Sequence, residues 1–198
     1  MARIPAAPRP GPLARVALAT TRRMFGRSLE PHRVVAHHRG VFWVTAVSET
    51  MLLRQRHRLP DSLRDLVQHR VAVVIGCPWC IDFGAMLALR GGLTAERIMA
   101  VPDYETSDLF TPLERRAMAF ADAATATPTS VTDEQVAALR AELGDAGVVE
   151  LAHLVALENQ RSRLNHALGI TSQGFTDAAV CVLPGVDVAP ADRDVRRT

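Results

Sequence analysis

The amino-acid sequence predicts an all-α protein, and three observations favour that class. Hydrophobic residues make up 48% of the 198 residues but aromatic residues only 5%, a balance that favours helices over a sandwich or a barrel. Several segments space their apolar residues with the period of a helix. Capping residues and prolines recur where these segments begin, so we expect antiparallel helices joined by short connections.

The first half of the chain contains three predicted helices, at residues 13–25, 41–57 and 61–76. The segment before them is rich in proline and should be extended. Pro60 ends the second helix, and Gly76 ends the third. The run VAVVI within the third helix could be a buried strand by composition. It continues the helical pattern that begins at Leu63 and Leu66, so we predict a helix.

From residue 78 onward the sequence predicts five more helices, at residues 78–90, 94–100, 112–124, 132–143 and 146–169. Pro78 suits a first helical position, where its missing N–H is no loss. The sequences TPLE from Thr111 and TDEQ from Thr132 are both typical of a capping box. Between the second and third of these helices we expect a loop.

Charge divides the chain unevenly. The net charge is only +2, but residues 1–70 hold 13 arginines and 4 acids, whereas residues 71–198 hold 10 arginines and 17 acids. The arginines are dispersed through apolar helical segments and are not clustered with aromatic residues. We therefore expect neither nucleic acid nor a membrane as a partner, but a solvated face or contact with an acidic partner subunit.

The organisation of the chain suggests one domain in the cytoplasm. No run of 18 apolar residues could span a bilayer, and the basic N-terminus does not have the pattern of a secretory signal. Three cysteines do not make a disulfide framework. We expect a basic arm with a short helix at 1–30, a helical domain at 31–175 and a charged tail at 176–198.

The stretch GCPWCIDFG, residues 76–84, places Cys77 and Cys80 at the start of the helix that Pro78 opens. At an N-cap, the free N–H groups of the first turn stabilise a thiolate, so the pKa of Cys77 should fall below its free value. Cys80 lies one turn further on and can close a disulfide with Cys77. The arrangement predicts a dithiol redox centre, in which one thiolate attacks and the other thiol resolves the product.

Two other interpretations of the cysteine pair stay open. A zinc site would need two more ligands, and the candidates by type are His57, Asp65, His69 and Cys181. No second CxxC or HxxxH supplies them at a local spacing, so we expect no metal and no cofactor. Alternatively, the two cysteines are small core residues at a helix contact.

Three segments, residues 64–93, 102–140 and 149–175, carry a resemblance to a known family. Together they are similar to the helices of the carboxymuconolactone decarboxylase and alkylhydroperoxidase superfamily. The resemblance implies an alkylhydroperoxidase-like helical bundle with the CxxC at the start of a core helix. It also implies a homo-oligomer, a trimer or a multiple of one.

Within that superfamily, the decarboxylase branch generally lacks the CxxC, and the hydroperoxidase branch uses it. The latter has a glutamate twelve residues before the first cysteine and a histidine four residues after the second. The resemblance places Cys77 and Cys80 at the cysteine positions, Asp65 at the glutamate position and Gly84 at the histidine position. It therefore implies thiol redox chemistry without the family's histidine.

An imidazole from the preceding helix could replace that histidine. Helices 61–76 and 78–90 should pack antiparallel because the joint between them is short, and this sets His69 level with Gly84. Asp65 lies four residues earlier on the same face and could orient the imidazole. The alternative is a partly exposed histidine beside a glycine that allows close packing.

These features together predict an alkylhydroperoxidase-like oxidoreductase with candidate catalytic residues Cys77, Cys80, Asp65 and His69. A hydroperoxide would oxidise one cysteine to a sulfenic acid, and the other would condense with it to a disulfide. An external thiol reductant, dihydrolipoamide- or thioredoxin-like, would reset the pair. Two alternatives remain: a carboxymuconolactone-type decarboxylase, and a catalytically degenerate helical oligomer with a structural CxxC.

Overall fold

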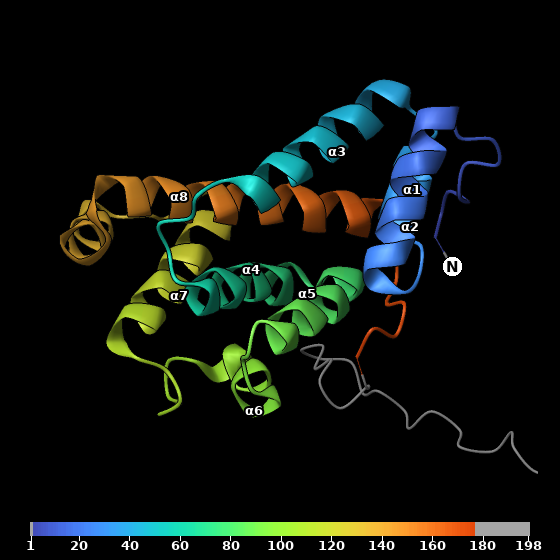
Figure 1. The fold of residues 1–198 in the computed structure, drawn as a ribbon. Coiled ribbons are helices and arrows are strands. Elements are labelled where there is room, and N and C mark those ends of the chain that lie inside the picture. The colour runs from blue at the N-terminus through green and yellow to red at the C-terminus, as the bar shows by residue number, and fades with distance from the viewer. Residues whose placement is uncertain (1, 177–198) are drawn as a thin grey trace, which may run out of the picture.

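The computed structural model describes residues 2–176 and confirms an all-α fold over that range (Figure 1). Its helices are α1 (Pro12–Phe25), α2 (Glu30–Val35), α3 (Arg39–Arg54), α4 (Asp61–Ile75), α5 (Pro78–Arg90), α6 (Ala95–Met99), the 3-10 helix η1 (Val101–Asp103), α7 (Pro112–Thr125) and α8 (Asp133–Ala167). None of the helices within this range is both long and apolar enough to cross a membrane. Cys181 and nearly all of the predicted tail lie outside the described residues.

Helix α4 forms the centre of the fold and packs against α5, α7 and α8. Its residues Leu63, Val67 and Val71 recur every fourth position and are almost fully buried. This spacing puts them on one face of the helix. They join the main core with apolar residues of the two facing helices, namely Ala117, Phe120, Ala121, Leu139, Leu151, Leu154 and Val155. The core therefore fixes the helix that leads into the cysteine pair.

The run VAVVI is helical, as predicted, and lies within α4. Val71, Ala72 and Val73 are all buried because α4 has neighbours on several sides. Val74 in the same run is 44% exposed, and Ile75 is half-buried. The strand-like composition thus reflects burial of the first three residues of the run.

The two predicted capping boxes are both present, at Thr111 before α7 and at Thr132 before α8. The two helices predicted after Thr132 are joined end to end in α8 at Gly144, whose backbone is non-helical with φ 68° and ψ 174°. Glycine adopts positive φ without the steric cost that other residues bear. The chain therefore bends at this single residue, and the second part of α8 runs back across α4.

Near the N-terminus the structure adds an element that the sequence pattern did not predict. Helix α2 is only six residues long, so its apolar periodicity is too short to recognise. The segment that precedes α1 reaches the C-terminal end of α8. There Arg3 donates hydrogen bonds from its backbone N–H to Leu168 O (2.8 Å) and from its guanidinium to Ala167 O (2.6 Å).

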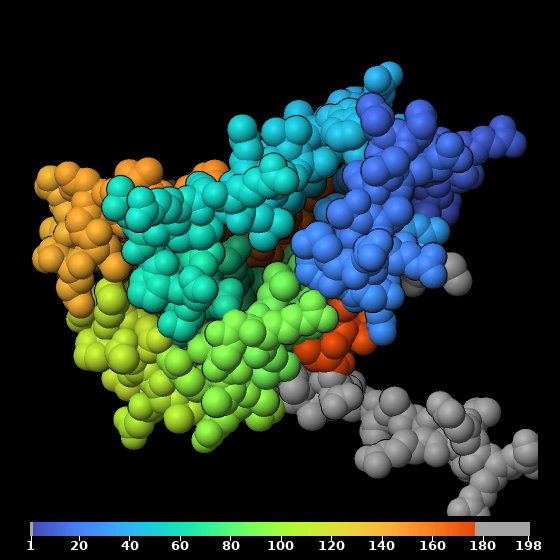
Figure 2. All heavy atoms as spheres, viewed as in Figure 1, coloured from blue at the N-terminus to red at the C-terminus, as the bar shows by residue number. Residues whose placement is uncertain are grey.

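Figure 2 shows a hollow between α1, α3 and α5, with α8 at its floor.

Candidate functional site

The cysteine pair lies at the turn where α4 ends and α5 begins. Gly76 has a left-handed backbone (φ 72°) that reverses the chain, and Cys77 follows as the N-cap of α5. Its Sγ accepts a hydrogen bond from the backbone N–H of Cys80 at 3.3 Å. The two cysteines form a disulfide, with their Cα atoms 5.3 Å apart. The predicted helix-start position and the predicted pairing are therefore both present.

Both sulfur atoms are enclosed by the protein. Cys77 has no exposed surface and Cys80 is 5% exposed, within a cluster that includes Val34, Ala72 and Ile170. The surroundings are apolar, which raises the cost of any charge that is not hydrogen-bonded.

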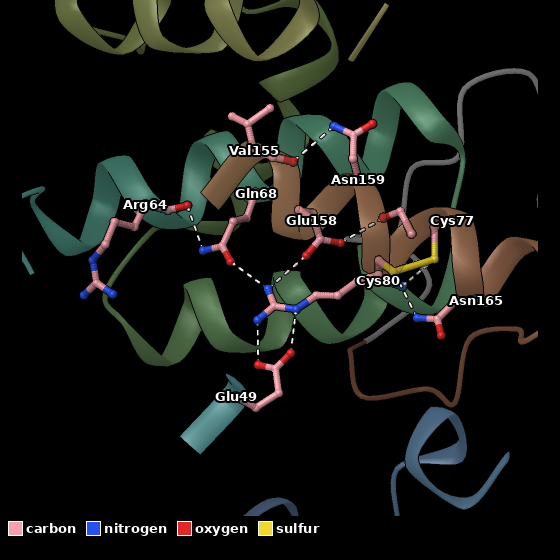
Figure 3. A network of polar contacts seen from close by, with 11 residues as sticks. Glu49, Arg64, Gln68, Cys77, Cys80, Val155, Glu158, Asn159 and Asn165 are labelled. Carbon is pink, nitrogen blue, oxygen red and sulfur yellow. Dashed lines mark hydrogen bonds and ion pairs between the residues drawn. A yellow bond between two sulfur atoms is a disulfide. The ribbon is translucent and has the colours of Figure 1, made fainter. Parts of the chain in front are cut away.

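A stripe of buried polar residues on α8 approaches the pair. Glu158, Ser162 and Asn165 are spaced by four and three residues, so they lie on one face of the helix. Asn165 Nδ2 donates a hydrogen bond to Cys80 Sγ at 3.3 Å (Figure 3). Sequence reasoning did not identify Asn165 as a site residue. The available signal was this spacing of polar residues within an otherwise apolar helical face.

The carboxyl of Glu158 belongs to a network that crosses three helices (Figure 3). It accepts hydrogen bonds from Ser162 Oγ at 2.8 Å and from Arg161 Nη1 at 3.2 Å. Arg161 also contacts Gln68 on α4 and Glu49 on α3. Burial raises the pKa of Glu158, although the guanidinium opposes that effect. One guanidinium therefore serves two carboxyl groups, and one of them, that of Glu158, belongs to the polar stripe of α8.

His69 lies level with Gly84, as the antiparallel register predicts. A Cβ placed on Gly84 would be 3.7 Å from His69 Nδ1. The imidazole is buried, which corrects the alternative expectation of a partly exposed ring, and burial lowers its pKa to about 4. Among residues 2–176, its Nδ1 has no hydrogen-bond partner and the ring makes no hydrogen bond to either sulfur. His69 is thus a neutral imidazole on the helix that precedes the pair, and its Nδ1 has no partner among the described residues.

Asp65 is placed apart from these groups. Its Oδ2 lies only 2.8 Å from where a Cβ of Gly91 would be, at the far end of α5, roughly 16 Å along the helix from Cys80 at 1.5 Å per residue. Burial raises the pKa of Asp65 to about 6. The hydrogen bond by which Asp65 was expected to orient His69 is not present in the described structure. The structure brings the cysteines together and sets His69 beside Gly84, and the catalytic roles of Asp65 and His69 stay predictions.

The last described segment, 172–176, is bound to α5 next to the cysteines. Asp82 accepts hydrogen bonds from Ser172 Oγ (2.7 Å) and from the backbone N–H groups of Gln173 (3.0 Å), Phe175 (3.0 Å) and Thr176 (2.9 Å). Burial disfavours the charge of Asp82, but these hydrogen bonds outweigh it and lower the pKa. The segment covers one side of the cysteine-bearing turn of α5.

Three of the residues considered as zinc ligands, His57, Asp65 and His69, do not form a metal site with the cysteines, and the fourth, Cys181, lies outside the described residues. Across residues 2–176, no group of three or more histidine, cysteine, aspartate or glutamate side chains is placed to hold a metal ion. His57 instead contacts the carboxylate of Glu150, which also accepts the backbone N–H of Arg58. Within the described chain, the site is therefore a pair of sulfurs with polar neighbours.

Comparison with known proteins gives matches in sequence. The profile of the carboxymuconolactone decarboxylase family matches residues 43–123. The uncharacterized protein YnjA of Escherichia coli K12 is 32% identical over 154 residues, which covers 78% of this chain and 85% of that protein. The uncharacterized protein YdfG of Bacillus subtilis 168 is 28% identical over 109 residues, covering 54% of this chain and 74% of YdfG.

Solved structures match in fold. The debrominase Bmp8 superposes with a TM-score of 0.76 at 19% identity, covering 89% of this chain and 94% of that one. An uncharacterized peroxidase-related protein from Ralstonia eutropha JMP134, described as an alkylhydroperoxidase AhpD core, gives 0.75 at 16% identity, covering 88% and 94%. The sequence matches show that the chain belongs to the carboxymuconolactone decarboxylase family, and the solved structures show that its fold is that of an alkylhydroperoxidase AhpD core.

Proposed function

We propose that the protein is a dithiol oxidoreductase that reduces organic hydroperoxides with Cys77 and Cys80. The observation that carries the proposal is the pair itself, which sits at a helix start, forms a disulfide and has a hydrogen-bond donor at each sulfur. A donor at sulfur favours the thiolate, which is the nucleophilic form of cysteine.

The proposed reaction needs two electrons for each peroxide. A thiolate attacks the terminal oxygen of ROOH, the O–O bond breaks, and ROH leaves after taking a proton, so the cysteine becomes a sulfenic acid. The second thiol attacks that sulfur, the S–S bond forms, and water leaves. A dithiol reductant, dihydrolipoamide- or thioredoxin-like, then exchanges with the disulfide and returns two electrons and two protons. The sum is ROOH plus dithiol giving ROH, water and disulfide.

An aromatic wall beside the pair supports an organic substrate. Trp79 stacks on Phe83 with ring centroids 4.6 Å apart, and Phe25 and Phe175 meet Phe83 edge to face at 5.1 Å and 5.2 Å. Such rings bind apolar groups better than they bind water-like molecules. We therefore expect a higher kcat/KM for an organic hydroperoxide such as cumene hydroperoxide than for hydrogen peroxide.

The test is a thiol balance on the reduced full-length protein. One equivalent of cumene hydroperoxide should consume two thiols per chain, and peptide mapping should place them in a Cys77–Cys80 disulfide with Cys181 free. Turnover with dihydrolipoamide should vanish in Cys77→Ser and Cys80→Ser and persist in Cys181→Ser, the matched control. A product that contains Cys181, or full turnover in the Cys77→Ser, Cys80→Ser double variant, contradicts the proposal.

The same double variant tests the lyase alternative. The family profile carries the name of a decarboxylase, and a decarboxylation of a lactone acid needs no thiol pair. Release of carbon dioxide from carboxymuconolactone by the double variant, at the wild-type rate, would favour that alternative. We expect no such release.

A second candidate is reductive debromination of an aromatic ring, which the aromatic wall beside the sulfurs favours. A cysteine-to-alanine variant of the debrominase Bmp8, whose fold matches this one, has been solved in complex with 2,3,4-tribromopyrrole. The balance is dithiol plus aryl bromide giving disulfide, arene and hydrogen bromide. Bromide release from that pyrrole by the reduced protein, with two thiols lost for each bromide, would distinguish this activity from peroxide reduction.

A further inference from the structure

A buried carboxamide lies against one of the two sulfur atoms. Asn165, near the end of α8, is 4% exposed, and its Nδ2 donates to Cys80 Sγ at 3.3 Å. Figure 3 shows the amide beside the disulfide, although the two residues are 85 positions apart in the chain. A disulfide sulfur carries no hydrogen, so only the NH₂ end of the amide can bond to it. The contact thus fixes which end of the amide faces the sulfur.

Packing alone gives no reason for a polar side chain here. The neighbours of Cys80 include Ala72, Ile81 and Ile170, so an aliphatic residue of similar size would suit the position. A buried amide costs free energy unless hydrogen bonds recover it, and neutral sulfur is a weak acceptor. A thiolate is a charged acceptor, and hydrogen bonds to charge are roughly twice as strong as neutral ones. The contact is therefore strongest when Cys80 is ionised.

The charged groups around the pair are engaged elsewhere or neutral. His69 on α4 has a pKa of about 4, and burial also lowers the pKa of His32 on α2. On α5, the charge of Asp82 is held by the 172–176 segment. On α8, Arg161 bonds to two carboxyl groups. Among residues 2–176, the side-chain donor that reaches Cys80 Sγ is Asn165.

We propose that Asn165 is a further catalytic residue, a donor that stabilises the Cys80 thiolate when the pair is reduced. When two electrons break the S–S bond, each sulfur becomes a thiol or a thiolate. The carboxamide holds the negative charge on Cys80, so this thiol loses its proton to solvent at a lower pH. The inference rests on the proposed dithiol function and adds to it a residue from another helix.

The experiment measures the pKa of Cys80 directly. In the full-length Cys77→Ser, Cys181→Ser background, Cys80 is the single thiol, and the rate of its alkylation by iodoacetamide against pH reports its pKa. We expect Asn165→Ala to raise that pKa by about one unit, which corresponds to about tenfold less thiolate at neutral pH. Asn165→Asp, nearly the same shape, should raise it further because a carboxylate repels the thiolate.

The matched control is Asn159→Ala, at a second asparagine that lies six residues earlier on α8. The amide of Asn159 donates to Thr125 Oγ1 and to Val155 O and not to sulfur. Its Cys80 pKa should equal that of the background. Circular dichroism verifies folding, and Asn165→Asp keeps the test valid if the alanine variant unfolds. A Cys80 pKa that neither Asn165 variant raises would overturn the inference. Since no peroxide is used, failure of peroxide reduction counts against the proposed function alone.

Discussion

Arg161 on α8 and Glu49 on α3 form a two-point ion pair, with Nε 2.8 Å from Oε1 and Nη2 2.6 Å from Oε2. Both side chains are partly buried, and α3 also packs through Leu52 on the main core and through Phe42 on α1 and α2. The pair therefore holds α3 onto the same helix that carries the polar stripe beside the cysteines.

Glu49→Gln should lower the free energy of unfolding by about 1–2 kcal/mol, because it removes a partly buried, two-point ion pair. The matched control is Glu142→Gln, which breaks the exposed pair with Arg116 and should cost less than about 1 kcal/mol. Urea unfolding of the three proteins measures both differences. Equal losses in the two variants would show that the Arg161 pair holds α3 no more strongly than a surface contact.

The buried His69 should make stability depend on pH in a definite direction. Its pKa is about 4 when folded and 6.5 as a free group, so as the pH falls below 6.5 the unfolded state takes up the proton first. The wild type should therefore lose stability as the pH falls from 6.5 to 4, by roughly 2 kcal/mol at pH 5. His69→Leu lacks this loss.

The measurement is the difference in unfolding free energy between the two proteins at pH 7.5 and at pH 5. Asp65 acts in the opposite direction, because its raised pKa of about 6 means that the folded state binds the proton first. It is present in both proteins and cancels in the difference. Parallel pH curves for wild type and His69→Leu would show that the imidazole is not buried in solution.

Gly84→Ala should stabilise the protein by roughly 0.5–1 kcal/mol. Gly84 is inside α5, where alanine is the better helix former, and the nearest atom to its new Cβ, His69 Nδ1, is at an ordinary contact distance of 3.7 Å. Gly91→Ala is the matched comparison, since its Cβ would meet Asp65 Oδ2 at 2.8 Å and force that carboxyl to move. The melting temperature of Gly84→Ala should be higher than that of wild type and higher than that of Gly91→Ala. A Gly84→Ala variant that melts below both would contradict the packing described around Gly84.

Helix α3 carries an apolar stripe that should contact a second copy of the chain. Val44, Val47 and Met51 are each at least half exposed and lie on one face of the helix. The excess of arginine in residues 1–70 and of acids in residues 71–198 makes two copies complementary in charge. Val47→Glu should therefore shift a homo-oligomer toward the monomer in light scattering, and Val149→Glu, at an exposed valine on α8, should not. A monomeric wild type at micromolar concentration would exclude this interface.

Much of the fold could be predicted from the sequence because it depends on local rules. The N-cap position of Cys77 follows from Pro78 and Gly76, and the capping box at Thr111 follows from four consecutive residues. The register of His69 and Gly84 follows from counting outward along two helices from a short turn.

The contacts that complete the site could not be predicted in this way. Asn165 and Cys80 are 85 residues apart, and Arg161 and Glu49 are 112 residues apart. Both contacts exist only because α8 packs across the other helices. A pattern of neighbouring residues in the sequence does not predict that packing. Asp65 shows a further limit. The spacing of four residues puts Asp65 on the same face of α4 as His69. Its carboxyl nevertheless points to Gly91 on α5, because glycine has no side chain to occupy that space.

The binding of segment 172–176 to Asp82 has a consequence for the newly made protein. The cysteine turn in the middle of the chain is covered by almost the last described residues, and Ala2 belongs to the same apolar cluster. A ribosome makes the cysteines long before it makes that segment. The nascent chain therefore carries its thiols without their final surroundings until residues 172–176 have been made and have left the ribosome, and in that interval oxidants and other thiols can reach them.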